Sequence, residues 1–139
     1  MERRIMKILL LGIIVLLMFG CNLKNNEAVV HDENIIDIEN IFLQKEESYY
    51  VLFYLDSCLS CRNVKVFFIK KKPSLNHNLY YIDVKNADFM VDFDKSNVEL
   101  KNYLDIKIHF VPTLFIIENK MVKEEIIGQK EITHYQNYF

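Results

Sequence analysis

Glycine, proline and tryptophan are scarce in this sequence: of 139 residues, three are glycine, two are proline and none is tryptophan. A glycine-rich phosphate-binding loop is excluded, because such a loop needs clustered glycines to bring its backbone close to the phosphate. The sequence also has no excess of basic residues, since the formal net charge is −2. This argues against a nucleic-acid-binding protein, which needs a basic face. Three cysteines are too few for a disulfide-rich mini-scaffold. A single small domain is the organisation that this length predicts.

The N-terminus begins with basic residues and continues as an apolar run. Residues 1–7 carry three basic side chains, and residues 8–19 are twelve residues without a charge. As a helix this run would rise only about 18 Å, which is too short for a hydrocarbon core of about 30 Å. The layout is typical of a secretory signal peptide. The run ends in Gly20-Cys21, and this ending resembles the lipobox of bacterial lipoproteins.

The lipobox resemblance implies that residues 1–20 are a signal peptide and that Cys21 becomes the diacylated first residue after cleavage. The alternative is an uncleaved N-terminal anchor with a free Cys21. Residues 21–34 are mostly polar and are predicted to be a tether to the domain that follows, residues 35–139. We therefore expect a lipid-anchored protein on the extracytoplasmic face of the cell membrane, where disulfides can persist.

Helical and strand patterns alternate along the domain. Apolar residues at helical spacing predict four helices, over residues 35–42, 61–72, 96–104 and 130–139. Apolar and aromatic runs predict four strands, over residues 49–55, 78–84, 113–118 and 121–127. Ser96 and Glu99 form a predicted capping box, and the acidic stretch 85–95 is predicted to be a loop. Two strand–helix–strand crossovers predict parallel pairing, and the Asn119-Lys120 turn predicts an antiparallel hairpin. The expected fold class is α/β, with a central mixed sheet of four to five strands and helices on both faces.

Two cysteines lie three residues apart, in Cys58-Leu59-Ser60-Cys61, where a predicted strand gives way to a predicted helix. The strand end exposes Cys58, and the amides and positive dipole end of the helix favour its thiolate, which is the nucleophilic form. The three-residue offset brings Cys61 close enough to bond to Cys58. The pair is therefore predicted to switch between dithiol and disulfide, with Cys58 attacking and Cys61 resolving the mixed disulfide.

Two other interpretations of the cysteine pair stay open. One is a static disulfide, although a bridge that closes so small a loop restricts the unfolded chain little. The other is a metal site, although zinc needs about four ligands and no second CxxC or HxxxH is present. His109 is a candidate third ligand or a neighbour that favours the Cys58 thiolate, and its alternative is an ordinary polar surface residue.

Residues 33–139 resemble a thioredoxin-fold protein. The resemblance rests on the aromatic strand, on the CxxC motif that opens a helix, and on Val111-Pro112-Thr113 ahead of the last two strands. It implies a three-layer sandwich, a cis Pro112 beside the cysteine pair, and a substrate-binding role for Val111 and Pro112, with Val111 offering backbone groups to an extended peptide. With its leader, the chain is also similar to small membrane-tethered bacterial thioredoxin-like proteins, including the bacteriocin transport accessory group.

The sequence departs from the family pattern around the motif. Ser57 stands where the family usually has tryptophan, and Leu59-Ser60 stand in place of Gly-Pro. Leu52 occupies the position of the buried acid that assists proton transfer to the resolving thiol in many members. These changes keep the nucleophile, but the resemblance then gives neither the reduction potential nor the speed of the resolving step.

Together these features predict a membrane-anchored, extracytoplasmic thiol–disulfide oxidoreductase that uses Cys58 and Cys61. Its expected substrates are cysteines of exported proteins or peptides, its redox partner is unidentified, and it is expected to need no cofactor. Two other classes remain: a non-catalytic accessory or binding module on the same scaffold, favoured by Leu52, and a copper-handling protein that uses the CxxC pair with His109.

Overall fold

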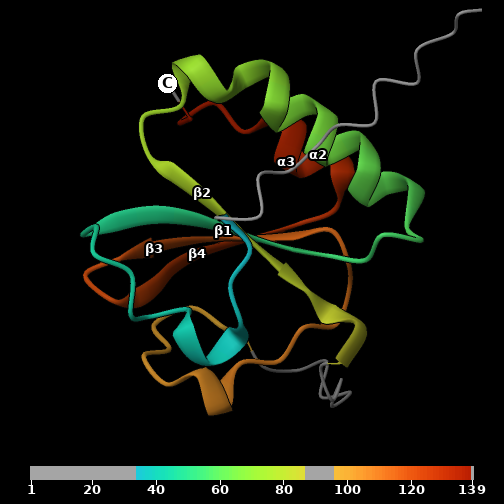
Figure 1. Ribbon diagram of the computed structural model, residues 1–139. Coiled ribbons are helices and arrows are strands. Elements are labelled where there is room, and N and C mark those ends of the chain that lie inside the picture. Colours follow the sequence, from blue (N-terminus) through green and yellow to red (C-terminus); the bar gives the residue numbers. More distant parts are fainter. Residues whose placement is uncertain (1–33, 87–95, 139) are drawn as a thin grey trace, which may run out of the picture.

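The computed structural model describes residues 34–86 and 96–138 (Figure 1). The predicted signal peptide, Cys21, nearly all of the tether and most of the predicted loop 85–95 lie outside the described residues. Among the residues that are described, no helix is both long and apolar enough to cross a membrane.

The described chain forms four strands and two α-helices. The strands are β1 (Ser48–Tyr54), β2 (Asn78–Asp83), β3 (Thr113–Glu118) and β4 (Met121–Ile127), and the helices are α2 (Leu59–Lys71) and α3 (Gln129–His134). The described chain also has short 3₁₀ helices, one before β1 and three between later elements: η2 (Ile38–Asn40), η3 (Lys72–Ser74), η4 (Val84–Asn86) and η5 (Tyr103–Asp105). All four predicted strands are confirmed to within a residue at each end.

The strands form one mixed sheet in the order β2-β1-β3-β4. Strands β1 and β2 are parallel, because α2 carries the chain from the end of β1 back to the start of β2. The pairings β1–β3 and β3–β4 are both antiparallel. The α/β class with a mixed sheet is therefore confirmed, whereas a second parallel pairing is wrong.

The antiparallel direction of β3 follows from the path of the chain before it. The Glu99 amide donates to the Val122 carbonyl at 2.7 Å, and the Val122 amide donates to the Leu100 carbonyl at 2.9 Å. These bonds hold the chain near the start of β4, at the end of the sheet remote from the cysteines. The chain then returns to Pro112 without forming a strand, so β3 starts where β1 and β2 end.

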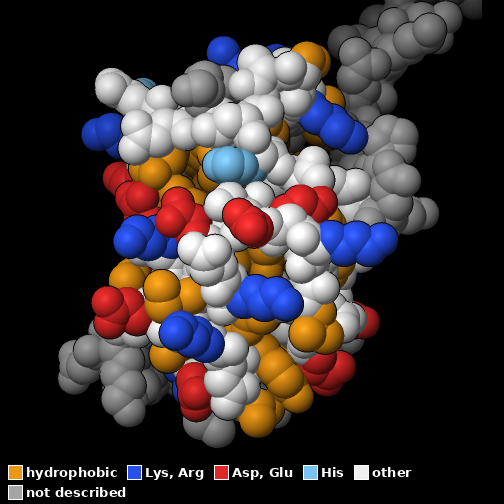
Figure 2. All heavy atoms as spheres, turned by 90° about the vertical axis from the view of Figure 1, so that its left-hand side faces the viewer, with side chains coloured by type: hydrophobic (Ala, Val, Ile, Leu, Met, Phe, Trp, Pro, Cys, Tyr) orange, Lys and Arg blue, Asp and Glu red, His pale blue; other side chains and the backbone are white. Residues whose placement is uncertain are grey.

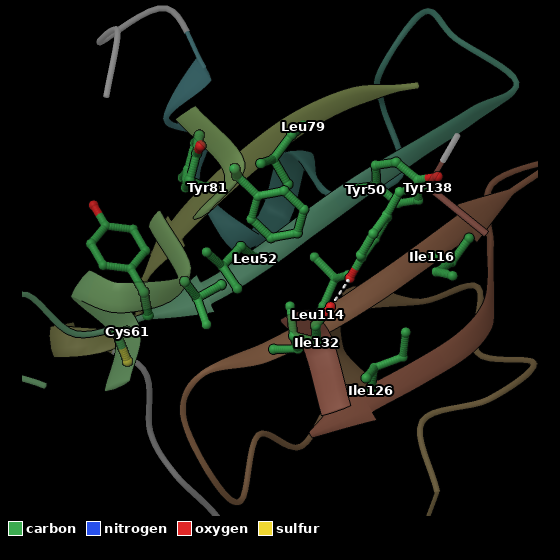
Figure 3. Packing of buried hydrophobic residues seen from close by; sticks show 13 residues of the cluster. Tyr50, Leu52, Cys61, Leu79, Tyr81, Leu114, Ile116, Ile126, Ile132 and Tyr138 are labelled. Atoms are coloured by element: carbon green, nitrogen blue, oxygen red, sulfur yellow. Dashed lines mark hydrogen bonds between the residues drawn. The ribbon is translucent and has the colours of Figure 1, made fainter. Parts of the chain in front are cut away.

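One face of the sheet is covered by α2 and α3, as Figure 1 shows. Alternate side chains of β1 point to this face, and Tyr50, Leu52 and Tyr54 are all buried there in one apolar cluster. Figure 3 shows Cys61 at one end of this cluster, away from Tyr138. The resolving thiol predicted from the sequence is thus part of the core itself.

The opposite face is covered by irregular segments with the short helices η2 and η5 (Figure 1). The predicted helices 35–42 and 96–104 are wrong over the described residues, because long-range hydrogen bonds hold these segments. The Ile36 amide donates to the Tyr81 carbonyl at 2.9 Å, which aligns this segment with the free edge of β2. The Ser96 hydroxyl accepts from the Val98 amide at 3.1 Å, which makes a local turn instead of a helix cap.

The C-terminal hairpin and helix agree with the sequence pattern in type but not in length. Asn119 and Lys120 have φ angles of 50° and 59° and form the predicted turn. Helix α3 has six residues instead of the ten predicted, because the chain turns at Tyr135 and inserts Tyr138 into the core. The Tyr138 hydroxyl there donates to the Ile132 carbonyl at 2.9 Å.

The two ends of the sheet differ in character. A cleft of about 730 Å³ lies at the end where β1 and β2 begin, and its lining includes Glu46, Lys72 and His77. Figure 2 shows the molecule from the left-hand side of Figure 1, with acidic and basic side chains interspersed and no field of one sign. The cysteine pair lies at the opposite end, where β1 and β2 finish.

Candidate functional site

Cys58 is placed by the turn that links β1 to α2. The Cys58 amide donates to the Leu55 carbonyl at 3.1 Å, which closes this turn, and the Arg62 amide donates to the Cys58 carbonyl at 3.1 Å, which starts the helix. The backbone of Cys58 is extended, with φ −82° and ψ 117°, so the residue is the N-cap of α2. The strand–helix junction predicted from the sequence is confirmed, and the first cysteine lies at its vertex.

Two backbone groups lie close to the Cys58 sulfur. The Cys61 amide donates a hydrogen bond to Cys58 Sγ at 3.2 Å, and the Cys58 thiol lies 3.8 Å from the Val111 carbonyl oxygen. The side chain is half-buried. The sulfur is therefore partly accessible at the N-terminus of α2 and accepts a backbone hydrogen bond there.

Cys61 is in a different environment. Its side chain is fully buried, and both cysteines are free thiols in this structure. Burial, together with its hydrogen bond to Cys58, raises the pKa of Cys61 to about 12. The pair therefore combines one partly accessible sulfur with one buried and protonated sulfur.

The third part of the site is the segment before β3. The Val111–Pro112 peptide bond is cis. The Thr113 hydroxyl donates to the Phe110 carbonyl at 2.8 Å, and the Gly128 amide donates to the Pro112 carbonyl at 2.9 Å. Gly128 has a φ of +98°, a conformation that a residue with a side chain rarely adopts. These bonds hold Val111 where its carbonyl faces the Cys58 sulfur.

Four sequence-predicted site residues are thus brought together, namely Cys58, Cys61, Val111 and Pro112. Cys21 lies outside the described residues. His109 is half-buried on the segment that leads to Pro112. Within residues 34–86 and 96–138, no group of three or more histidine, cysteine or acidic side chains is arranged to hold a metal ion. The copper interpretation finds no three-ligand cluster in that part of the chain.

The sequence interpretation did not single out Lys65, a charged residue of α2 near the pair. The Lys65 ammonium lies over the Tyr54 ring, 3.2 Å from its centroid, and 3.1 Å from an Asp56 carboxylate oxygen. The second Asp56 oxygen lies 3.2 Å from the Lys85 ammonium. These lysines, with the Lys65 hydrogen bond as the largest cause, lower the pKa of Asp56. The four-residue spacing of Cys61 and Lys65 on a helix was the available signal.

Two large apolar side chains are exposed beside the site. Leu59, inside the CxxC motif, is 64% exposed, and Phe110, next to Val111, is 58% exposed. Leu59 directly follows Cys58 in the chain. Phe110 directly precedes Val111, whose carbonyl faces the Cys58 sulfur. Both ends of the Cys58–Val111 contact are therefore flanked by apolar surface.

Comparisons with known proteins find similarity only at the level of solved structures. No protein-family model matches the chain, and no curated protein matches it. Among solved structures, the oxidised form of mitochondrial thioredoxin 3 from Saccharomyces cerevisiae is 14% identical. It covers 69% of this chain and 83% of its own, with a TM-score of 0.49.

Two further solved structures are similar to this chain. Thioredoxin f2 from Chlamydomonas reinhardtii is 17% identical, with 68% of this chain and 82% of that chain covered and a TM-score of 0.47. A mutant thioredoxin from Halobacterium salinarum is 14% identical, with 75% and 86% covered and a TM-score of 0.49. The chain's own strand order, with CxxC at the start of α2 and a proline before β3, is the α/β arrangement that the sequence resemblance implied.

Proposed function

We propose that this protein is a thiol–disulfide oxidoreductase that uses Cys58 and Cys61. The observation that carries the proposal is the contrast between the two sulfurs. Cys58 is half-buried at a helix N-cap and accepts a hydrogen bond from the Cys61 amide, whereas Cys61 is fully buried one turn behind it. A static bridge would not require one accessible sulfur, and exchange with a substrate does.

The reaction is a two-step exchange. The Cys58 thiolate attacks a substrate disulfide, forms a mixed disulfide, and releases one substrate sulfur as a thiolate. The Cys61 thiolate then attacks Cys58 Sγ, the Cys58–Cys61 bond forms, and the second substrate sulfur leaves. Two electrons pass from the dithiol to the substrate, and the two protons released by the cysteines balance those taken up by the substrate thiolates. The reverse sequence oxidises a substrate dithiol.

The proposed substrates are cysteine-containing peptide segments of exported proteins. The Val111 carbonyl lies 3.8 Å from Cys58 Sγ, so a peptide that runs along Val111 brings its own cysteine to the nucleophile. The exposed Leu59 and Phe110 side chains favour segments with apolar residues next to that cysteine. A second thiol–disulfide protein must restore the pair after each turnover.

Trapping of mixed disulfides tests the proposed chemistry. With Cys61→Ser, the intermediate on Cys58 cannot be resolved, so we expect a stable adduct with an aromatic or peptide disulfide. Cys58→Ser is the matched control and should give none. Mass spectrometry under non-reducing conditions identifies the adduct and its position. Equal capture by both variants, or capture by neither, would refute the assigned roles.

We also propose that the protein is anchored at the cell membrane through a diacylated Cys21 and acts outside the cytoplasm. The support is the basic start, the apolar run 8–19 and the Gly20-Cys21 ending. Growth with a labelled fatty acid should label the full-length protein, and Cys21→Ser should abolish the label and release the domain from membranes. Retention of the label in Cys21→Ser would refute this anchor.

One observation favours a second candidate, a non-catalytic binding module on the same scaffold. Leu52, at the position of the family's buried acid, is fully buried in the apolar cluster that contains Cys61. A chain without that acid could keep the fold and lose the exchange. The test is complementation of cells that lack the protein. If the Cys58→Ser, Cys61→Ser double variant restores their phenotype as well as the wild type does, the binding module is supported.

A further inference from the structure

The proposed resolving step requires Cys61 to become a thiolate, although its surroundings oppose a negative charge. Cys61 is fully buried, and its cluster consists of aliphatic and aromatic side chains, among them Leu52 and Tyr54. Burial raises the pKa of Cys61 far above its ordinary value. Because Leu52 stands in place of an acid, some other group must favour the Cys61 thiolate when the mixed disulfide is resolved.

Lys65 is a partly buried cation on the same helix as this sulfur. It lies four residues after Cys61 in α2, and residues at this spacing are neighbours on one helix face. Its side chain is only 12% exposed, although lysine is usually solvated. The Tyr54 ring holds the ammonium at 3.2 Å from its centroid, and Tyr54 belongs to the same cluster as Cys61.

The partner of Lys65 does not cancel its effect at Cys61. Asp56 lies 3.1 Å from the Lys65 ammonium, but its side chain is 59% exposed, so solvent screens the carboxylate more than the ammonium. Asp56 also shares its charge with Lys85, at 3.2 Å. In the Lys65–Asp56 ion pair, the ammonium therefore lies against the buried cluster, and the carboxylate lies toward solvent.

We propose that Lys65 is a positioning residue for the resolving step, where its fixed positive charge stabilises the Cys61 thiolate in place of a buried acid. The inference rests on the proposed oxidoreductase function. Cys61 gives its proton to solvent and attacks Cys58 Sγ. The Cys58–Cys61 bond forms, and the bond to the substrate breaks. The electron pair of that bond leaves with the substrate sulfur, which is protonated from solvent. Lys65 stays protonated throughout.

The charged and titratable groups around Cys61 and Lys65 come from four elements and one turn. They are Tyr54 on β1, Asp56 in the following turn, Tyr81 and Asp83 on β2, Lys85 on η4, and Cys58 at the start of α2. Asp83 and Lys85 are paired at 3.1 Å. The Lys65 charge lowers the pKa of Cys61 and so opposes the effect of burial. No second cation among these groups contacts the Tyr54 ring.

The test separates the two chemical steps in single-turnover reactions of the reduced protein with dithiobisnitrobenzoate. Attack by Cys58 releases the first nitrothiolate, and attack by Cys61 on the mixed disulfide releases the second. Lys65→Met removes the charge and keeps the apolar stem. We expect its second phase to slow by about three- to tenfold at neutral pH and its pH profile to move to higher pH, with the first phase unchanged.

Two matched variants guard against a merely structural effect. Lys65→Arg keeps the charge and should restore the second phase, and Lys70→Met removes an exposed charge from the same helix and should behave as the wild type. A second phase that Lys65→Met leaves unchanged, or that Lys70→Met slows equally, would overturn the role of Lys65. A wild-type protein that releases no second nitrothiolate would refute the proposed function itself, and with it this inference.

Discussion

The Cys61 amide donates a hydrogen bond to the sulfur of Cys58 at 3.2 Å, so the backbone of one cysteine of the pair supports the sulfur of the other. This contact exists because Cys58 is the N-cap of α2 and Cys61 is the third residue of that helix. The same geometry sends the Cys61 side chain into the core. One helix start therefore creates two thiols with opposite environments.

Alkaline pH should destabilise the reduced protein. Burial, as the largest cause, raises the pKa of Cys61 from 9.0 to about 12 and that of Tyr50 and Tyr81 from 10.0 to about 12. Above about pH 9 the unfolded chain releases protons that the folded chain retains, so the free energy of unfolding falls as pH rises toward about 12.

Urea unfolding of the reduced protein at a series of pH values measures this effect. We expect a constant midpoint at neutral pH and a progressive fall from about pH 9 upward. Cys61→Ala should remove the earliest part of the fall and leave the part due to the tyrosines. A midpoint that stays constant up to pH 12 would contradict the burial of these groups.

The exposed apolar side chains at the site should determine substrate preference. Leu59→Ser and Phe110→Ser remove apolar surface on the two sides of the Cys58–Val111 contact. We expect kcat/KM to fall by about three- to tenfold for disulfide peptides with apolar residues beside the cysteine, since each lost contact contributes about 1 kcal/mol. Peptides with only polar neighbours serve as the control substrate and should react equally with all three proteins.

We expect the Asn97 side chain to stabilise the fold. It is 1% exposed, and its amide group donates to the Lys107 carbonyl and to Glu125, each at 2.7 Å, and accepts from the Lys107 amide at 2.8 Å. Asn97→Ala leaves these part-buried partners without their hydrogen bonds, so we expect a loss of about 2–3 kcal/mol in the free energy of unfolding.

Asn102→Ala is the matched control for Asn97. Its exposed side chain only caps the short helix η5, by accepting from the Leu104 amide at 3.2 Å. Its loss should cost about 1 kcal/mol or less in denaturant titrations. Equal effects of the two substitutions would show that Asn97 does not anchor its segment to β4.

Leu52 should contribute to the fold and not to the nucleophile. Its side chain is fully buried between β1 and α2, so Leu52→Ala should lower the free energy of unfolding by about 2–5 kcal/mol. Leu104→Ala, at a position that is 65% exposed, should change it by less than about 0.5 kcal/mol. Chemical denaturation checks both values. The first nitrothiolate phase should be unchanged in Leu52→Ala, and its loss would place Leu52 in the site.

The sequence pattern predicted the conformation correctly where residues adjacent in the chain decide it. The strand 113–118 has the predicted limits, and Asn119 and Lys120 form the predicted turn. The helix that follows Cys58 ends at Lys71, just before Pro73, as the proline predicted. In each case the residues that decide the conformation are adjacent in the chain.

The pattern failed where distant hydrogen bonds decided the conformation. Residues 35–42 have helical apolar spacing, yet the Ile36 amide bonds to Tyr81 of β2. Glu99, predicted inside a helix, has a φ of 71° and bonds through its amide to Val122. Both segments pack some of their apolar side chains, such as Phe42 and Leu100, against the second face of the sheet. Helical spacing alone does not distinguish this outcome from a helix.

The sequence by itself determined the cysteine pair and its place between a strand and a helix, because both depend on short-range spacing. The proline segment was expected beside the pair only through the resemblance to thioredoxin-fold proteins. Only the tertiary structure decided which charge accompanies the pair. Lys65 looks like an ordinary helix-surface lysine in the sequence. Its ammonium is held near the core because Tyr54 and Asp56, from the strand end and the turn before the helix, meet it there. Contacts between side chains from different elements depend on how those elements pack, and the spacing of residues along one element does not determine that packing.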